Sequence, residues 1–179
     1  DAVEPYRALA PYEEGQGALI ERARAYLKIQ DGCDRHCTYC IIPAARGPIR
    51  SRSLEALQAE TQSAAKAGHA EIVLTGIRLA SYGRERGLTL ADALKAAAET
   101  DVQRIRLGSL DPDEISQDLI DALAAEKKFC RQFHLSLQSG CDNTLHRMAR
   151  RYTTAQFADT VARIRAAMPD AVFPTDVMR

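Results

Sequence analysis

The chain has 179 residues, 46% of them hydrophobic and 27% charged, a balance typical of one globular domain with its own core. Its 24 basic and 24 acidic residues cancel, so net charge gives no overall attraction to DNA or RNA. No run of about 18 apolar residues occurs, which argues against a membrane-spanning segment. The chain starts at Asp1 rather than Met, so we expect a processed or excised piece of a longer protein.

Strands and helices are predicted to alternate along most of the chain. Residues 1–24 are expected to form an N-terminal linker, and residues 25–179 a single α/β domain. Short β-prone segments predict five strands, at 25–30, 71–75, 104–108, 133–138 and 171–177. Amphipathic segments predict five helices, at 54–67, 88–100, 113–125, 142–150 and 154–168.

This alternation is typical of parallel strands joined by crossover helices. Two architectures fit, a doubly wound open sheet and a barrel or partial barrel. No Gly-x-Gly-x-x-Gly follows the first strand, which weakens the dinucleotide-binding form of the open sheet. The chain ends directly after the fifth predicted strand, so we expect the fold to be truncated there.

Five cysteines occur, and three of them fall within eight residues of one another. An odd number argues against a disulfide framework and favours a reducing, cytoplasmic location. Residues 32–41 read Gly-Cys-Asp-Arg-His-Cys-Thr-Tyr-Cys-Ile, which gives the spacing Cys33-x3-Cys37-x2-Cys40. The other two, Cys130 and Cys141, are expected to pack in the fold rather than bind metal.

Three thiolates from one short loop can hold a single metal centre. A structural zinc site needs four closed ligands, usually in two separated pairs. A [4Fe-4S] cluster with three protein ligands instead leaves one iron open to an external ligand. The spacing favours the cluster, with zinc as the alternative.

The pattern Cys33-x3-Cys37-x2-Cys40 after a first strand resembles the radical S-adenosylmethionine (SAM) superfamily. The resemblance implies a partial (β/α)6 barrel of the TIM type, here truncated after about the fifth strand. It also implies two cofactors, a [4Fe-4S] cluster on the three cysteines and SAM. Tyr39, just before the third cysteine, matches a family position that lies near the SAM adenine.

Further segments resemble one family in that superfamily, the radical SAM methylthiotransferases. The segments "KIQDGCD", "RSRS" and "LTGIRLASYG" are most similar to the branch that acts on N6-threonylcarbamoyladenosine beside the anticodon of tRNA. The implied reaction replaces the C2 hydrogen of the adenine by a methylthio group. It proceeds through reductive cleavage of SAM to methionine and a 5′-deoxyadenosyl radical. The matching segments are 28–33, 40–43, 45–47, 50–52, 74–77, 81–83, 134–140 and 150–153.

Alternatives within this family are modification of a ribosomal-protein aspartate or of isopentenyl-adenosine in tRNA. An alternative of a different class is a cluster-free fragment that docks RNA. The resemblance implies tRNA, SAM and an electron donor such as flavodoxin or ferredoxin as partners, with no membrane and no DNA. Only the central domain of the family is expected here, able to bind a cluster but not to complete methylthiolation alone.

Candidate contact residues follow from strand ends and from the resemblance, and no catalytic acid or base is assigned. Parallel α/β folds place active sites after the carboxyl ends of strands. Residues expected to contact SAM are Tyr39, Thr75, Gly76, Gln138, Ser139 and Arg150, with Arg151 as the alternative to Arg150. Residues expected to contact RNA phosphates are Arg46, Arg50 and Arg52. Loop capping and solvated charge are the competing explanations.

Overall fold

The computed structural model describes residues 23–178. Its sheet has the order β2-β1-β3-β4, with β1 (Arg24–Asp31), β3 (Glu71–Gly76) and β4 (Arg104–Leu107) parallel. The two-residue strand β2 (Arg50–Ser51) pairs antiparallel with the end of β1. The expected linker at 1–24 lies almost entirely outside the described residues.

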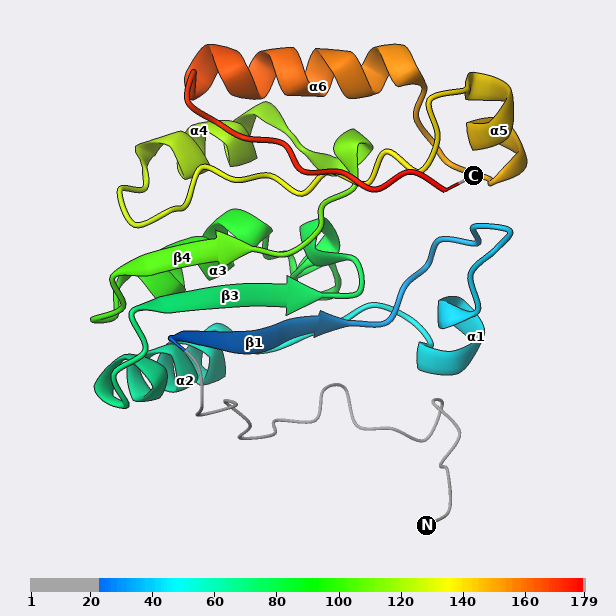
Figure 1. Cartoon of the computed structure of the whole chain (residues 1–179). Coiled ribbons are helices and arrows are strands. Elements are labelled where there is room, and N and C mark those ends of the chain that lie inside the picture. The colour runs from blue at the N-terminus through cyan, green and yellow to red at the C-terminus, as the bar shows by residue number, and fades with distance from the viewer. Residues whose placement is uncertain (1–22, 179) are drawn as a thin grey trace.

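Helices cover one face of this sheet (Figure 1). The long helices are α2 (Leu54–Lys66), α3 (Leu90–Ala98), α4 (Gln117–Ala125) and α6 (Thr154–Ala167). Ser53, Thr89, Ser116 and Thr153 cap them, each accepting a hydrogen bond from a first-turn amide. Short elements are α1 (Ile42–Arg46), α5 (Asp142–Arg147) and the 3-10 turns Leu79–Ser81, Arg84–Arg86 and Pro112–Glu114.

The core lies between the sheet and these helices. Alternate residues of each strand face it, for example Leu27, Ile72 and Ile105, all 1% exposed or less. From the helices, Leu94 and Ile120 pack into the same cluster. The alternation leaves much of the opposite, concave face of the sheet to polar side chains such as Arg24, Lys28 and Arg104.

The segments expected as the fourth and fifth strands continue this sheet only through isolated parallel bridges. Those bridges join Ile105 to Phe129, Leu110 to Leu135, Gln132 to Val172 and Gln138 to Val177. Figure 1 shows the two segments, yellow and red, running alongside β4 in that order. The curved row confirms the α/β partial barrel, but a regular ladder at 133–138 and 171–177 was wrong.

Local backbone chemistry explains the broken ladder. Pro174 has no amide hydrogen to donate. Gln138 has a φ of 66°, outside the extended region. Two further differences are that α4 begins at Gln117 rather than at 113, and that α5 ends at Arg147 rather than at 150. No helix in residues 23–178 is long and apolar enough to cross a membrane.

Candidate metal and cofactor site

The cysteine loop, residues 32–49, is closed at its base. The Cys33 amide donates to the Gly47 carbonyl at 3.0 Å, where the pairing of β1 with β2 ends. Gly32 has a φ of 72°, and a Cβ there would lie 1.8 Å from the carbonyl oxygen of Pro48. Only glycine fits that position, so the chain enters the loop in one fixed conformation.

The three cysteines of the loop differ in exposure. Cys37 is buried, Cys33 is half-buried and Cys40 is exposed, and all three are free thiols. The Cys40 amide donates to the Cys37 carbonyl at 3.0 Å. Within residues 23–178 no three His, Cys, Asp or Glu side chains converge as metal ligands. The loop therefore brings the cysteines to one end of the sheet without closing their sulfur atoms around a point.

Burial changes the acidity of the first thiol. It raises the pKa of Cys33, although the Arg35 amide, 3.4 Å from its Sγ, acts in the opposite direction. A thiol of raised pKa is neutral near pH 7, so ligation of a metal by Cys33 would release its proton.

Gln30 links the start of the loop to the neighbouring strand. Its Nε2 donates to the carbonyls of Asp31 and Gly32, both at 2.8 Å, and its Oε1 accepts from the Arg78 amide at 2.7 Å. A Cβ on Gly76 would approach that Oε1 to 2.8 Å. The glycine at the end of β3 therefore lets the Gln30 amide sit between the two strand ends.

Buried ion pairs join the loop to the segment that follows β4. Arg78, 3% exposed, lies between Glu114 and Asp34, and its Nε donates to Glu114 at 2.9 Å. Arg35, from the cysteine loop itself, donates to Asp113 at 2.6 Å. These pairs fix the cysteine loop against the 3-10 turn Pro112–Glu114.

Arg150 reaches the buried cysteine from the other side. Its Nη1 lies 3.4 Å from the Cys37 Sγ, its Nη2 pairs with Asp111, and its Nε donates to Tyr152 Oη at 3.2 Å. Burial would lower the pKa of this guanidinium, but Asp111 keeps it above the ordinary value, so Arg150 stays charged. The Tyr152 hydroxyl donates to the Leu137 carbonyl at 3.0 Å. A fixed positive charge thus contacts Cys37.

The other residues expected to contact SAM lie at the same end of the sheet. Thr75 donates from its hydroxyl to a β1 carbonyl at 3.3 Å, and Gly76 is the last residue of β3. Gln138 is in the left-handed region, and the Ser139 hydroxyl accepts the amide two residues later at 3.2 Å. Tyr39 is 46% exposed. These five and Arg150 remain predicted SAM contacts.

The arginines expected to contact RNA are largely engaged within the protein. Arg46 and Arg50 both lie 3.6 Å from the carboxylate of Asp31. Arg52 is 6% exposed and pairs with Glu60 on α2. Arg46, with a side chain 52% exposed, is the most open of the three. Their contact with RNA stays a prediction.

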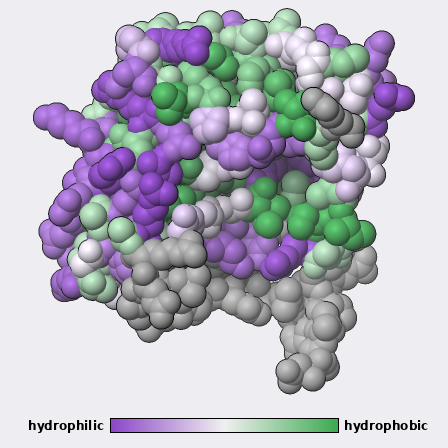
Figure 2. Space-filling view, in the orientation of Figure 1, coloured by the Kyte–Doolittle hydropathy of each residue, from purple (hydrophilic) through white to green (hydrophobic). Residues whose placement is uncertain are grey.

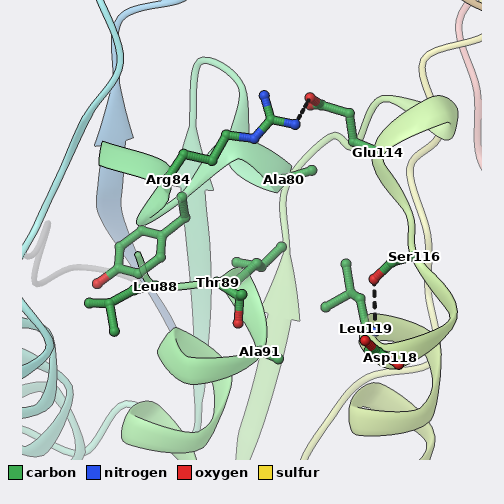
Figure 3. A pocket seen from close by; sticks show the side chains of 11 residues that line it. Ala80, Arg84, Leu88, Thr89, Ala91, Glu114, Ser116, Asp118 and Leu119 are labelled. Atoms are coloured by element: carbon green, nitrogen blue, oxygen red, sulfur yellow. Dashed lines mark hydrogen bonds and ion pairs between the residues drawn. The ribbon is translucent and has the colours of Figure 1, made fainter. Parts of the chain in front are cut away.

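A pocket of about 190 Å³ lies where α3 and α4 begin (Figure 3). Arg84 and Glu114 meet at its edge with a distance of 3.0 Å, and Thr89, Ser116 and Leu119 are among its lining residues. None of the three loop cysteines lines it. The pocket is therefore separate from the cysteine loop, although Glu114 belongs to both surroundings.

Residues 27–179 match the family described as the Radical SAM superfamily, so the match begins within β1 and includes every later element. The chain belongs to the radical SAM superfamily. Membership implies a [4Fe-4S] cluster and SAM as its cofactors.

Relatives of this radical SAM chain include named tRNA-modifying enzymes. It is 37% identical over 93% of its length to the threonylcarbamoyladenosine tRNA methylthiotransferase MtaB of Thermotoga maritima, and 39% identical over 90% to that of Bacillus subtilis. It is 38% identical over 86% to the tRNA-2-methylthio-N(6)-dimethylallyladenosine synthase of Thermus thermophilus. The chain spans 39%, 36% and 34% of these three proteins, respectively.

Solved radical SAM structures share the fold. The methyltransferase TsrM from Kitasatospora setae superposes with a TM-score of 0.68 at 17% identity, over 85% of this chain and 30% of TsrM. The cobalamin-dependent enzyme OxsB gives 0.67 at 12% identity, over 86% of this chain and 23% of OxsB. At these identities the likeness concerns architecture alone, and it supports the partial barrel.

The residues present fit a cluster. Three free cysteines come from one loop that is anchored at its base. A cluster with three thiolate ligands is anionic, and this radical SAM loop carries Arg35, which is buried and has no hydrogen-bond partner for Nε or Nη1. Arg150 adds a second positive charge at Cys37. Such surroundings stabilise thiolate charge and tune a cluster's reduction potential.

Sequence reasoning did not identify the residues that hold this loop in place. Gln30, Arg35, Arg78 and Glu114 each join segments distant in sequence, for example 36 residues apart for Arg78 and Glu114. One signal was available for Gln30, a polar residue that ends the first predicted strand, whereas Glu114 fell inside the helix predicted at 113–125. Strand ends face the site in parallel α/β folds.

Proposed function

We propose that this chain is the radical SAM domain of a tRNA methylthiotransferase that converts N6-threonylcarbamoyladenosine to its 2-methylthio derivative. The observation that carries the proposal is identity of 37–40% over 88–93% of the chain to three enzymes of that name. Because the chain spans only 36–39% of those enzymes, the activity belongs to the whole protein. The chain alone is expected to bind cofactors without completing the reaction.

The second candidate substrate is dimethylallyladenosine in tRNA. Enzymes named for it match at 37–41% identity, so identity alone does not separate the two branches. What supports the first branch is sequence, namely "LTGIRLASYG" at 74–83 and "KIQDGCD" at 28–34. The ribosomal-protein aspartate remains a third candidate substrate.

Within this proposal the chain's residues have separate tasks. Cys33, Cys37 and Cys40 hold the cluster, whose chemistry when bound is reduction of SAM. Arg150 holds a positive charge at the Cys37 sulfur, 3.4 Å away. Its pairing with Asp111 fixes the guanidinium, so any contact with the SAM carboxylate uses a donor that Asp111 leaves open.

SAM and the cluster lie together at the carboxyl end of the strands in this proposal. Thr75, Gly76, Gln138 and Ser139 follow or end the neighbouring strands there, and Tyr39 supplies an aromatic surface for the adenine. The main tasks of the protein are orientation and exclusion of water. We propose tRNA as the substrate partner, a flavodoxin or ferredoxin as electron donor, and the cytoplasm as the location.

The decisive experiment is to delete the gene that encodes this chain from its host and analyse tRNA nucleosides by mass spectrometry. We expect 2-methylthio-N6-threonylcarbamoyladenosine to disappear while its unmethylthiolated precursor accumulates. Re-expression of the gene should restore the product, and re-expression with Cys37→Ala should not, because a cluster ligand is missing.

Two other outcomes would redirect the proposal. Loss of the methylthiolated dimethylallyladenosine alone would assign the protein to the second branch. Unchanged tRNA nucleosides together with loss of a methylthio group from a ribosomal protein would assign it to the third.

A further inference from the structure

The concave face of the sheet is unusually polar for the inside of a barrel. Side chains alternate along β1, so Ala25, Leu27 and Ile29 are buried while Arg24, Tyr26 and Lys28, each one position earlier, are exposed. In closed barrels this inner face is filled by layers of branched apolar side chains. Along β1 this concave face therefore presents polar side chains rather than branched apolar ones.

Three arginines gather around one carboxylate where the strands begin. Glu71 on β3 accepts from Arg24 Nε at 2.8 Å, from Arg106 Nε at 2.8 Å and from Arg104 Nε at 3.3 Å. The register places Arg24 and Arg104 on either side of Glu71 in adjacent strands. Figure 2 shows hydrophilic residues gathered at the left, over the starts of these strands.

Arg24, Arg104 and Arg106 together with Glu71 carry a net charge of +2. Glu71 itself is buried, and Arg106 is 17% exposed. Arg24 and Arg104 remain 51% and 58% exposed. One arginine is enough to neutralise Glu71, and the half-buried Arg106 can do so. The positive charges of Arg24 and Arg104 are therefore available to an anion.

We infer that this concave strip, Arg24, Tyr26, Arg104 and Arg106, binds the phosphodiester backbone of a single-stranded RNA loop. Single-stranded RNA is recognised by a cationic groove that follows its phosphates together with aromatic side chains on which its bases stack. Tyr26 is 43% exposed and follows Arg24 on the same face of β1, so both elements are present side by side. Guanidinium forks match phosphate oxygens in two-point contacts.

The strip leads to the cysteine loop. From Arg24 to Asp31 the strand rises by about 23 Å at roughly 3.3 Å per residue. That length corresponds to a few nucleotides of extended backbone. A loop whose phosphates lie on the arginines can therefore place a base that is a few nucleotides away near Cys33, at the opposite end of β1.

The inference rests on the proposed function, because it supplies the binding surface for that RNA substrate. Its test measures binding alone, without SAM, reductant or turnover. Failure of the RNA-binding surface is therefore distinguishable from failure of the proposed methylthiotransferase function.

The probe is a fluorescein-labelled anticodon stem-loop RNA, and the readout is anisotropy at salt concentrations between about 50 and 200 mM. The test variant is R24Q/R104Q in the full chain, which keeps Arg106 as the partner of buried Glu71. We expect roughly tenfold weaker binding at low salt. The slope of log K against log salt should fall by about 0.7 for each phosphate that the variant no longer neutralises.

The matched control is K66Q/K95Q, which removes two positive charges from exposed positions on the outer helices α2 and α3. It should leave both affinity and slope unchanged. A further variant, Y26A, should weaken binding several-fold with no change of slope, because stacking involves no counterion release.

Equal slopes for the parent chain, R24Q/R104Q and K66Q/K95Q would overturn the inference, whether or not the gene deletion changes tRNA nucleosides. If R24Q/R104Q fails to fold by circular dichroism, R104Q alone replaces it, with an expected fall in slope of about 0.7. The binding assay could show a reduced slope for R24Q/R104Q while deletion of the gene leaves tRNA nucleosides unchanged. That pair of results would support the RNA-binding surface and refute the proposed substrate.

Discussion

The two ends of the same three strands use arginine–carboxylate pairs in different ways. At the carboxyl end, Arg78 and Glu114 are each 3% exposed and hold the cysteine loop in place. At the amino end, Glu71 is equally enclosed, but Arg24 and Arg104 remain more than half exposed. The comparison teaches that burial of the cation, rather than the number of ion pairs, separates a positioning network from a binding surface.

The largest expected effect concerns the cysteines at the carboxyl end. Changing Cys33, Cys37 or Cys40 to Ala should abolish cluster binding, since each is proposed to supply one of the three thiolate ligands. After anaerobic reconstitution we expect about four irons and four sulfides per parent chain and close to none in each variant. Cys130→Ala is the matched control, because Cys130 lies at the amino end, 3.7 Å from Glu71.

The metal analysis also decides between cluster and zinc. Iron that persists in all three alanine variants, or zinc in its place, would contradict the assignment of the loop.

The next effect tests the buried network itself. Glu114→Gln removes the buried charge that Arg78 and Arg35 share, and leaves Arg78 with the exposed Asp34 and Arg35 with Asp113 as their carboxylate partners. We expect a loss of roughly 3–5 kcal/mol in the free energy of unfolding, or a fall in Tm of roughly 10 °C. Urea and thermal unfolding followed by circular dichroism measure it. A loss below about 1 kcal/mol would place this pair among ordinary surface interactions.

A smaller effect with a pH signature is expected at the amino end. Burial alone would raise the pKa of Glu71, but Arg106, Arg24 and Arg104 lower it below its ordinary 4.5. Its stabilisation is therefore complete above pH 4.5 and is lost as pH falls through the lower folded pKa. Glu71→Gln should cost about 2 kcal/mol at neutral pH and lose less further stability on acidification.

Unfolding by urea between pH 7 and pH 3 measures that dependence. Asp31, whose pKa is also lowered, remains in the variant, so some acid sensitivity persists. If the free energy of unfolding of parent and variant changed in parallel with pH, the arginines would not lower the pKa of Glu71 as described.

The smallest effect should come from Arg84, which pairs with Glu114 at 3.0 Å but has a side chain 52% exposed. Arg84→Ala should change the free energy of unfolding by less than about 0.5 kcal/mol, because water replaces the interaction. Comparison with Glu114→Gln on the same carboxylate isolates the contribution of burial. A cost near that of Glu114→Gln would refute the distinction between buried and exposed cations.

Much of the fold follows from local sequence. The β-prone segment at 25–30 and the amphipathic segments at 54–67 and 154–168 predict elements that the structure places within one residue of expectation. The regular ladder expected at 171–177 does not form, since periodicity ignores the missing amide of Pro174. The antiparallel β2 that follows the cysteine loop was also missed, because two residues carry too little pattern.

In the candidate site too, some residues can be predicted from local sequence and others cannot. Cysteine spacing predicts a metal centre because its ligands are close in sequence. The residues that fix the loop are not close in sequence, as Arg150 and Cys37 lie 113 residues apart. Cys130 was expected to pack as a small apolar side chain, but it is half-buried and lies 3.4 Å from Arg104. Such contacts arise from the chain path, which residue periodicity does not encode.

The closed base of the cysteine loop bears on how the protein matures. Bringing together the ends of a flexible segment of this length costs roughly 2–3 kcal/mol in conformational entropy. Here β1, β2 and the hydrogen bond from Cys33 to Gly47 meet that cost during folding of the polypeptide. The fold therefore already holds both ends of the loop, and binding of a cluster would need to rearrange only the residues between Cys33 and Cys40.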